Sequence, residues 1–186
     1  MHELLDTAYQ NFVQSLDSYS KGVSESVTES DVRLKVIDRI FTEILGWKHS
    51  DISTEEETGS GYLDYKFSIE GLGRLVVEAK RDSASFGFKG RNSGRAYKLS
   101  GPALSGSPHP SKGISQAIAY SGVKNCELAC VTNGNEWVIF RANRTGDGTD
   151  TRDGMGFIFT SLEEIKSNFS IFFDLLAKEK VEQFSF

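Results

Sequence analysis

The chain has 186 residues, of which 38% are hydrophobic and 25% are charged, and it contains 13 phenylalanines. This supply of apolar side chains is enough for a substantial core, so the composition excludes a disordered tail and a small disulfide-stapled fold. The length predicts one domain rather than two catalytic units. The sequence has no long apolar run and no signal-peptide pattern, which predicts a cytoplasmic protein with no membrane span.

The charge is unevenly distributed along the chain. The net charge is -5, yet residues 80–112 hold seven cations and the single acid Asp82, and this net +6 leaves −11 on the remainder. One concentrated basic segment favours contact with a polyanion at one place. Residues 82–111 lack hydrophobic periodicity and are rich in Gly and Ser, so we expect a long basic surface loop there. The cations that we expect to bind nucleic acid are Arg81, Lys89, Arg91, Arg95 and Lys98.

The N-terminal part is predicted to be helical. Residues 28–46 carry apolar side chains at helical spacing, and Thr28 with Asp31 forms a capping-box-like start. Gly46 is a natural helix stop. A weaker helix is expected within residues 3–18, followed by a separator rich in Ser and Gly. Residues 1–27 are therefore expected to be a helical extension, and residues 28–186 a single domain.

After Trp47 the hydrophobic period changes from 3.6 to 2. Residues 62–69 and 74–80 predict a hairpin with its turn at 70–73. The further elements that we expect are a short helix at 114–123, strands at 126–131, 137–142 and 156–160, and a long helix capped by Ser161 and Glu164. This order predicts a mixed β-sheet flanked by helices, in an α/β or α+β domain.

The hairpin brings two acids together. If its turn centres near Gly71, Asp64 lies opposite Glu78, and strand alternation puts Glu78 and Lys80 on one face. Opposed like charges are destabilising, so this cluster implies a compensating cation, and carboxylate oxygens suit magnesium or manganese. The alternative is an ordinary solvated hairpin face. Against it, the charges interrupt a run at 75–80 that is otherwise typical of a buried strand.

These residues resemble a known motif. Leu63-Asp64, followed after 13 residues by Glu78-Ala79-Lys80, is similar to the PD-(D/E)xK motif of the restriction-endonuclease-like nucleases, with Leu in place of Pro. Together with the helix start at 28–33 and Gln116–Tyr120, it resembles the N-terminal nuclease domain of type I restriction enzyme motor subunits over residues 28–142. The resemblance implies an αβββαβ core, including a strand near 52–58 that periodicity does not predict.

The resemblance also implies roles for single residues. Asp64 and Glu78 would bind the divalent metal, and Lys80 would act on the attacking water or the scissile phosphate. Glu29 would approach the same metal, although an acid in the first helical turn also simply favours the helix dipole. Gln116 and Tyr120 match a motif beside the active site, with a surface polar pair as the alternative.

The sequence therefore predicts a metal-dependent endonuclease domain that hydrolyses DNA with Mg²⁺ or Mn²⁺, in a restriction or phage-defence system. We expect it to work with a motor, ATPase or sensor domain or subunit, because nothing in the sequence resembles a helix-turn-helix or a zinc finger and a nuclease without such a specificity element would be toxic if freely active. No phosphate-binding P-loop motif occurs in the sequence, so we do not expect a P-loop ATPase within it. A catalytically silent nucleic-acid-binding or assembly module of the same fold is the alternative. An RNA nuclease also remains open.

Overall fold

The computed structural model describes residues 2–59, 61–81, 84–88, 90–143 and 148–183. Its helices are α1 (His2–Ser24), α2 (Glu29–Val32), the π-helical turns η1 (Arg33–Ile37) and η2 (Ile40–Ile44), the 3₁₀ turns η3 (His49–Asp51) and η4 (Thr151–Asp153), α3 (Pro102–Ser105), α4 (Pro108–Lys124), α5 (Leu162–Ser167), α6 (Phe169–Leu176) and α7 (Lys178–Gln183). Its strands are β1 (Ile52–Glu57), β2 (Tyr62–Ile69), β3 (Leu72–Ala79), β4 (Arg95–Lys98), β5 (Leu128–Thr132), β6 (Trp137–Arg141) and β7 (Met155–Phe159).

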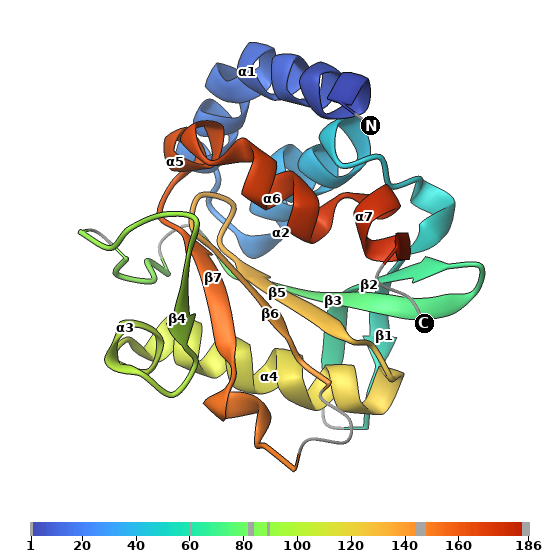
Figure 1. Cartoon of the computed structure of the whole chain (residues 1–186), viewed down its shortest axis with the longest axis vertical. Coiled ribbons are helices and arrows are strands. Elements are labelled where there is room, and N and C mark those ends of the chain that lie inside the picture. Colours follow the sequence, from blue (N-terminus) through green and yellow to red (C-terminus); the bar gives the residue numbers. More distant parts are fainter. Residues whose placement is uncertain (1, 60, 82–83, 89, 144–147, 184–186) are drawn as a thin grey trace.

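The strands form one seven-stranded sheet in the order β1-β2-β3-β5-β6-β7-β4. β3 and β5 pair in parallel, and the other pairings of described strands are antiparallel. In Figure 1, α4 crosses one face of the sheet, while α1, α2 and α5 to α7 lie over the other. The predicted α/β class with a mixed, helix-flanked sheet is confirmed. No helix among the described residues is long and apolar enough to cross a membrane.

The helix start at Thr28 has the predicted capping box. The Thr28 hydroxyl accepts a hydrogen bond from the Asp31 N–H at 3.1 Å, and the Asp31 carboxylate accepts one from the Thr28 N–H at 3.0 Å. The helical path ends at Gly46, whose φ of +76° suits glycine. α1 is longer than expected because it continues through Ser24, and its buried face packs into the main core.

The β2–β3 register is the predicted one at the end of the hairpin that carries Asp64 and Glu78. Tyr65 pairs with Val77 and Phe67 with Leu75, which places Asp64 beside Glu78. A bulge between Phe67 and Ser68 then shifts the register by one residue. The turn is consequently the tight pair Glu70-Gly71, with both φ angles positive, rather than the expected 70–73.

β3 is buried on both faces from residue 75 to residue 79, so the alternative of a solvated hairpin face is wrong at Glu78. Leu75, Val77 and Ala79 belong to the main core, and Val76 packs on the opposite face. Glu78 is only 3% exposed. α4 contacts both β3 and β5, which is why the face that carries Glu78 is covered.

The described part of residues 82–111 is folded and is not the long surface loop that we expected. It contains β4, which pairs with β7, and α3. Its buried side chains, which form part of a second core cluster, are Phe86, Phe88, Leu99 and Leu104. The Glu136 carboxylate anchors the segment by accepting the backbone N–H groups of Phe86 at 2.7 Å and Phe88 at 3.1 Å.

The C-terminal helix is capped as predicted but is not continuous. The Ser161 hydroxyl accepts a hydrogen bond from the Glu164 N–H at 3.1 Å. The helical path then breaks at Asn168, which ends α5 and precedes α6. The two shorter helices cover the sheet beside α1 (Figure 1).

Candidate active site

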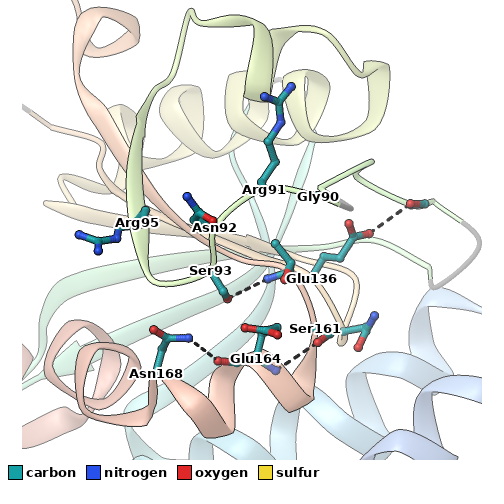
Figure 2. A pocket seen from close by; sticks show the side chains of 12 residues that line it. Gly90, Arg91, Asn92, Ser93, Arg95, Glu136, Ser161, Glu164 and Asn168 are labelled. Carbon is teal, nitrogen blue, oxygen red and sulfur yellow. Dashed lines mark hydrogen bonds between the residues drawn. The ribbon is translucent and has the colours of Figure 1, made fainter.

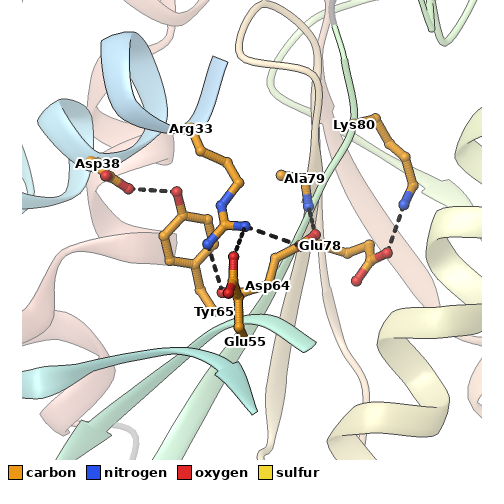
Figure 3. Close-up of polar contacts among 8 residues, drawn as sticks. All are labelled: Arg33, Asp38, Glu55, Asp64, Tyr65, Glu78, Ala79 and Lys80. Carbon is orange, nitrogen blue, oxygen red and sulfur yellow. Dashed lines mark hydrogen bonds and ion pairs between the residues drawn. The ribbon is translucent and has the colours of Figure 1, made fainter. Parts of the chain in front are cut away.

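The three residues of the motif meet at the end of the β2–β3 hairpin. The Asp64 Oδ2 accepts the Ala79 N–H at 2.7 Å, and the Lys80 Nζ lies 2.6 Å from the Glu78 Oε1 (Figure 3). The Lys80 N–H donates to the Thr132 carbonyl at 2.7 Å, which extends the pairing of β3 with β5 beyond Ala79. The parallel ladder therefore fixes the backbone from which Lys80 reaches back to Glu78.

Glu78 is a buried carboxylate with one oxygen left without a partner. Oε1 faces Lys80, but Oε2 is buried and has no hydrogen-bond partner among the described residues. Burial, with smaller contributions from Asp64 and Glu29, raises the pKa of Glu78 to about 7 against the opposing effect of Lys80. The close ion pair with Lys80 favours the ionised form of Glu78, but burial and the neighbouring acids outweigh it, so the pKa remains raised overall. An unpaired acceptor in a buried site is costly unless something binds there.

The two other acids lie in the same electrostatic environment. Burial raises the pKa of Asp64, with the Ala79 N–H, Arg33 and Lys80 opposing the rise. Burial also raises the pKa of Glu29, in the first turn of α2, and Asp64 contributes to that rise. The Arg33 Nη1 lies 3.7 Å from the Asp64 Oδ1. Arg33 has no role in the sequence motif, although its spacing of four residues from Glu29 on a helix was a usable signal.

A pocket of about 280 Å³ lies beside this cluster. The residues that line it are Glu29, Lys80, Arg81, Ala84, His109, Lys112 and Gln116. Sequence reasoning alone assigns His109 no catalytic role and counts Lys112 only among the cations of residues 80–112. His109 precedes Gln116 by seven residues and Lys112 precedes it by four, which places all three on one face of α4 and was the signal that could have found them.

Gly113 allows α4 to lie close to the sheet at this pocket. A Cβ at position 113 would lie 2.5 Å from the Val131 Cγ1 and 3.6 Å from the Lys80 Cε. The Gln116 Oε1, one turn further along α4, is buried without a hydrogen-bond partner. Gln116, which lines the pocket and which the sequence predicted for the site, therefore carries a second buried acceptor without a partner among the described residues.

Tyr120 lies apart from the pocket. Its side chain is buried in a small apolar cluster with Leu63, Val76 and Cys126. Its hydroxyl faces Gly61, where a Cβ would lie 2.8 Å from it. The structure thus brings Glu29, Asp64, Glu78, Lys80, Arg81 and Gln116 together, and it places Tyr120 in packing between α4 and the β2–β3 hairpin.

The other predicted nucleic-acid-binding residues are dispersed. Arg91 and Arg95 lie at a separate polar cleft of about 870 Å³, where their side chains point away from each other (Figure 2). Neither forms an ion pair with a residue in the described part of the chain. Lys98 pairs with Asp153 at 3.0 Å. Lys89 lies outside the described residues.

The acids suit a hard cation that keeps much of its water. Within the described ranges, no three His, Cys, Asp or Glu side chains are arranged to hold an ion. Magnesium typically takes one or two carboxylates and retains several waters, and Asp64 and Glu78 supply that number. The unpaired Oε2 of Glu78 offers such an ion a free ligand atom. The assignment of Glu29 as a third ligand stays a prediction.

Comparison of the chain with protein-family models, with curated proteins and with solved structures gives no match.

Proposed function

We propose that this chain is a metal-dependent endonuclease of the PD-(D/E)xK type, with a restriction-endonuclease-like αβββαβ core, and that it hydrolyses phosphodiester bonds in DNA. The core would comprise α2, β1, β2, β3, α4 and β5. We further propose that it acts in a restriction or phage-defence system together with a motor, ATPase or sensor partner.

The observation that carries this proposal is the unpaired Oε2 of Glu78. This atom is buried beside Asp64, in a residue that is 3% exposed, and the one adjacent ammonium faces the other oxygen. A fold that only needed a stable strand would gain by placing an apolar residue at position 78. A buried carboxylate oxygen without a hydrogen-bond partner supports the proposal that a cation binds to it.

Each motif residue has a chemical role in this proposal. Asp64 and Glu78 hold the magnesium or manganese ion, which when bound supplies a Lewis acid for water activation and charge neutralisation. Lys80 keeps its ammonium at the same carboxylate, where it orients the attacking water and stabilises charge on the phosphate. Hydrolysis forms a bond from the water oxygen to phosphorus as the P–O ester bond breaks. The attacking water gives up a proton to solvent, and the leaving oxygen takes one up from solvent and departs as a hydroxyl.

The adjacent pocket fits the anionic substrate. Lys80, Arg81 and Lys112 line it, and Arg81 and Lys112 form no ion pair with any residue in the part of the chain that the structure describes. Unpaired cations next to a nucleophile site are the groups that contact nucleic-acid phosphates. His109 and Gln116 add hydrogen-bonding groups on the α4 side.

Incubation of the full chain with supercoiled plasmid tests the proposal. We expect nicking with Mg²⁺ or Mn²⁺, none with chelator, and none from Glu78→Gln or Lys80→Ala. Single-stranded RNA of matched length serves as the second substrate. A chain that binds DNA but leaves it intact with either metal supports the catalytically silent module, and cleavage of RNA alone supports the RNA nuclease.

A further inference from the structure

Arg33 is held in a fixed position against Asp64. Its guanidinium lies over the Tyr65 ring at 4.7 Å, and its Nη2 donates to the Asp64 carbonyl oxygen at 3.4 Å. Its Nη1 is 3.7 Å from the Asp64 Oδ1 and 3.4 Å from the Glu55 Oε1. Figure 3 shows the guanidinium between these groups. With its side chain only 15% exposed, Arg33 has little freedom to swing away.

The support for Arg33 is itself anchored. The Tyr65 hydroxyl donates to the Asp38 Oδ1 at 2.5 Å, which ties the ring to the helix that carries Arg33. Glu55 lies opposite Asp64 across the β1–β2 ladder, and its φ of +56° is unusual for a residue other than glycine. A strained backbone residue beside a site persists only where its surroundings hold it there.

The Asp64 carboxylate is therefore restrained at both oxygens. Oδ2 accepts the Ala79 N–H at 2.7 Å, and Oδ1 faces the Arg33 guanidinium. Each carboxylate oxygen has two lone pairs, so either one can still bind a cation. What the carboxylate has lost is the freedom to rotate and present both oxygens to one ion.

We propose that Arg33 is a positioning residue that makes Asp64 a one-oxygen ligand and so makes the site prefer Mg²⁺ to Ca²⁺. This inference rests on the proposed function. Magnesium requires near-octahedral geometry at short distances and usually keeps several waters, so a rigid single-oxygen ligand suits it. Calcium takes six to eight oxygens at longer distances and often uses both oxygens of a carboxylate, so it gains more when Asp64 can turn.

The ratio of the Mg²⁺ affinity to the Ca²⁺ affinity separates the positioning of Asp64 by Arg33 from the repulsion between the Arg33 charge and the metal ion. Loss of the guanidinium removes the same repulsion from both ions, because each carries two charges. The electrostatic contribution therefore largely cancels in the ratio, and what remains is the freedom of the Asp64 carboxylate.

The experiment is calorimetric titration of the metal-free full chain with MgCl₂ and, separately, with CaCl₂. In Arg33→Gln we expect the preference for Mg²⁺ over Ca²⁺ to fall by about 10-fold, in the range typical of residues that orient metal ligands. Arg33→Lys keeps the charge but not the two-pronged contact. We expect it to hold the absolute affinities nearer to wild type while the preference still falls.

Arg39 provides a matched control on the same helical segment. Its guanidinium lies over the Tyr19 ring at 4.9 Å, and its Nε is 2.9 Å from the Glu43 Oε1. Arg39 therefore has the same kinds of contact as Arg33, with a tyrosine ring and with a carboxylate, but it does not contact Asp64 or Glu78. Arg39→Gln should leave the preference unchanged. Circular dichroism of each variant checks folding, and Arg33→Lys carries the test if Arg33→Gln does not fold.

The outcomes are distinct. An unchanged preference in folded Arg33 variants overturns the role of Arg33 while the proposed function stands. An equal fall in Arg39→Gln overturns it too, because the effect would then be a general loss of rigidity. If wild type binds neither ion, the proposed function fails and this inference fails with it.

Discussion

Two glutamates in the same sheet each contact lysine, but their pKa values are shifted in opposite directions. Glu56, on β1, has a lysine for each oxygen, with Lys66 at 2.6 Å and Lys124 at 2.8 Å, and these contacts lower its pKa to about 2. Glu78, on β3, has one lysine and a pKa of about 7. Both pairs are close, so distance alone does not distinguish them. Burial is the largest cause of the raised pKa of Glu78, and Asp64 adds to it, whereas the two lysine contacts outweigh burial at the more exposed Glu56. The chain also satisfies both oxygens of Glu56, as at a structural ion pair, but leaves one oxygen of Glu78 without a partner among the described residues.

The largest contrast should appear in activity. Glu78→Gln should reduce metal-dependent DNA cleavage by at least about 100-fold, because loss of one transition-state charge contact costs on that order. Glu56→Gln should cut at close to the wild-type rate. Initial rates of plasmid nicking measure both. Comparable losses of cleavage rate in Glu78→Gln and Glu56→Gln would show that Glu78 has no special role in cleavage.

The second contrast is in the pH dependence of stability without metal. The folded pKa of Glu78 is raised from 4.5 to about 7, so its contribution favours folding at low pH. This contribution is lost as the pH rises from about 4.5 through 7, and it amounts to roughly 3 kcal/mol at most. Urea unfolding in chelator between pH 5 and 8 should therefore show Glu78→Gln gaining stability over wild type as the pH rises. A constant difference across this range would contradict the raised pKa.

Glu56 should behave with the opposite sign and in a different pH range. Its folded pKa is lowered from 4.5 to about 2, so its stabilisation is present above about pH 4.5 and is lost as the pH falls toward 2. At pH 7 we expect Glu56→Gln to lower the free energy of unfolding by about 2 kcal/mol, discounted for partial exposure. The same urea titrations measure it. A variant as stable as wild type at pH 7 would show that the two lysines add nothing.

The smallest expected effect concerns the basic residues outside the pocket. If Arg91 and Arg95 contact phosphates, Arg91→Ala and Arg95→Ala should each flatten the slope of log K against log salt by about 0.9. Lys98→Ala is the matched control, because Lys98 is already paired with Asp153. Fluorescence anisotropy with a DNA duplex in chelator measures the slopes. If all three variants had the same slope as wild type, the polar cleft would not contact DNA.

The acid pair was predictable from sequence because it depends on local geometry. Once a hairpin turn near Gly71 is inferred, strand alternation and pairing fix Asp64 beside Glu78, and the observed pairing of Tyr65 with Val77 agrees. The bulge after Phe67 was not predictable, since it displaces only the turn and leaves the apolar alternation before it intact.

Features that depend on distant parts of the chain were missed. Phe86 and Phe88 lie in a segment without a sustained periodic pattern, and their backbone N–H groups are bound by the Glu136 carboxylate, about 50 residues away in sequence. Tyr120 illustrates the same limit on α4. Its spacing from Gln116 puts both on one helix face, but a full turn separates them along the axis. That turn carries Tyr120 past the pocket and into the cluster around Val76.

The parallel pairing of β3 with β5 also sets an order of events during folding. The β2–β3 hairpin is local in sequence, so Asp64 and Glu78 can meet early, while both carboxylates are still hydrated. Residues 80–127 must then cross over before β5 can dock and α4 can cover Glu78. Closing such a long connection is slow, because the loop entropy is lost before the new contacts form. On a ribosome, the acids leave the exit tunnel well before the strand that completes their enclosure, so a nascent chain that ends before β5 would carry the whole motif without a formed site.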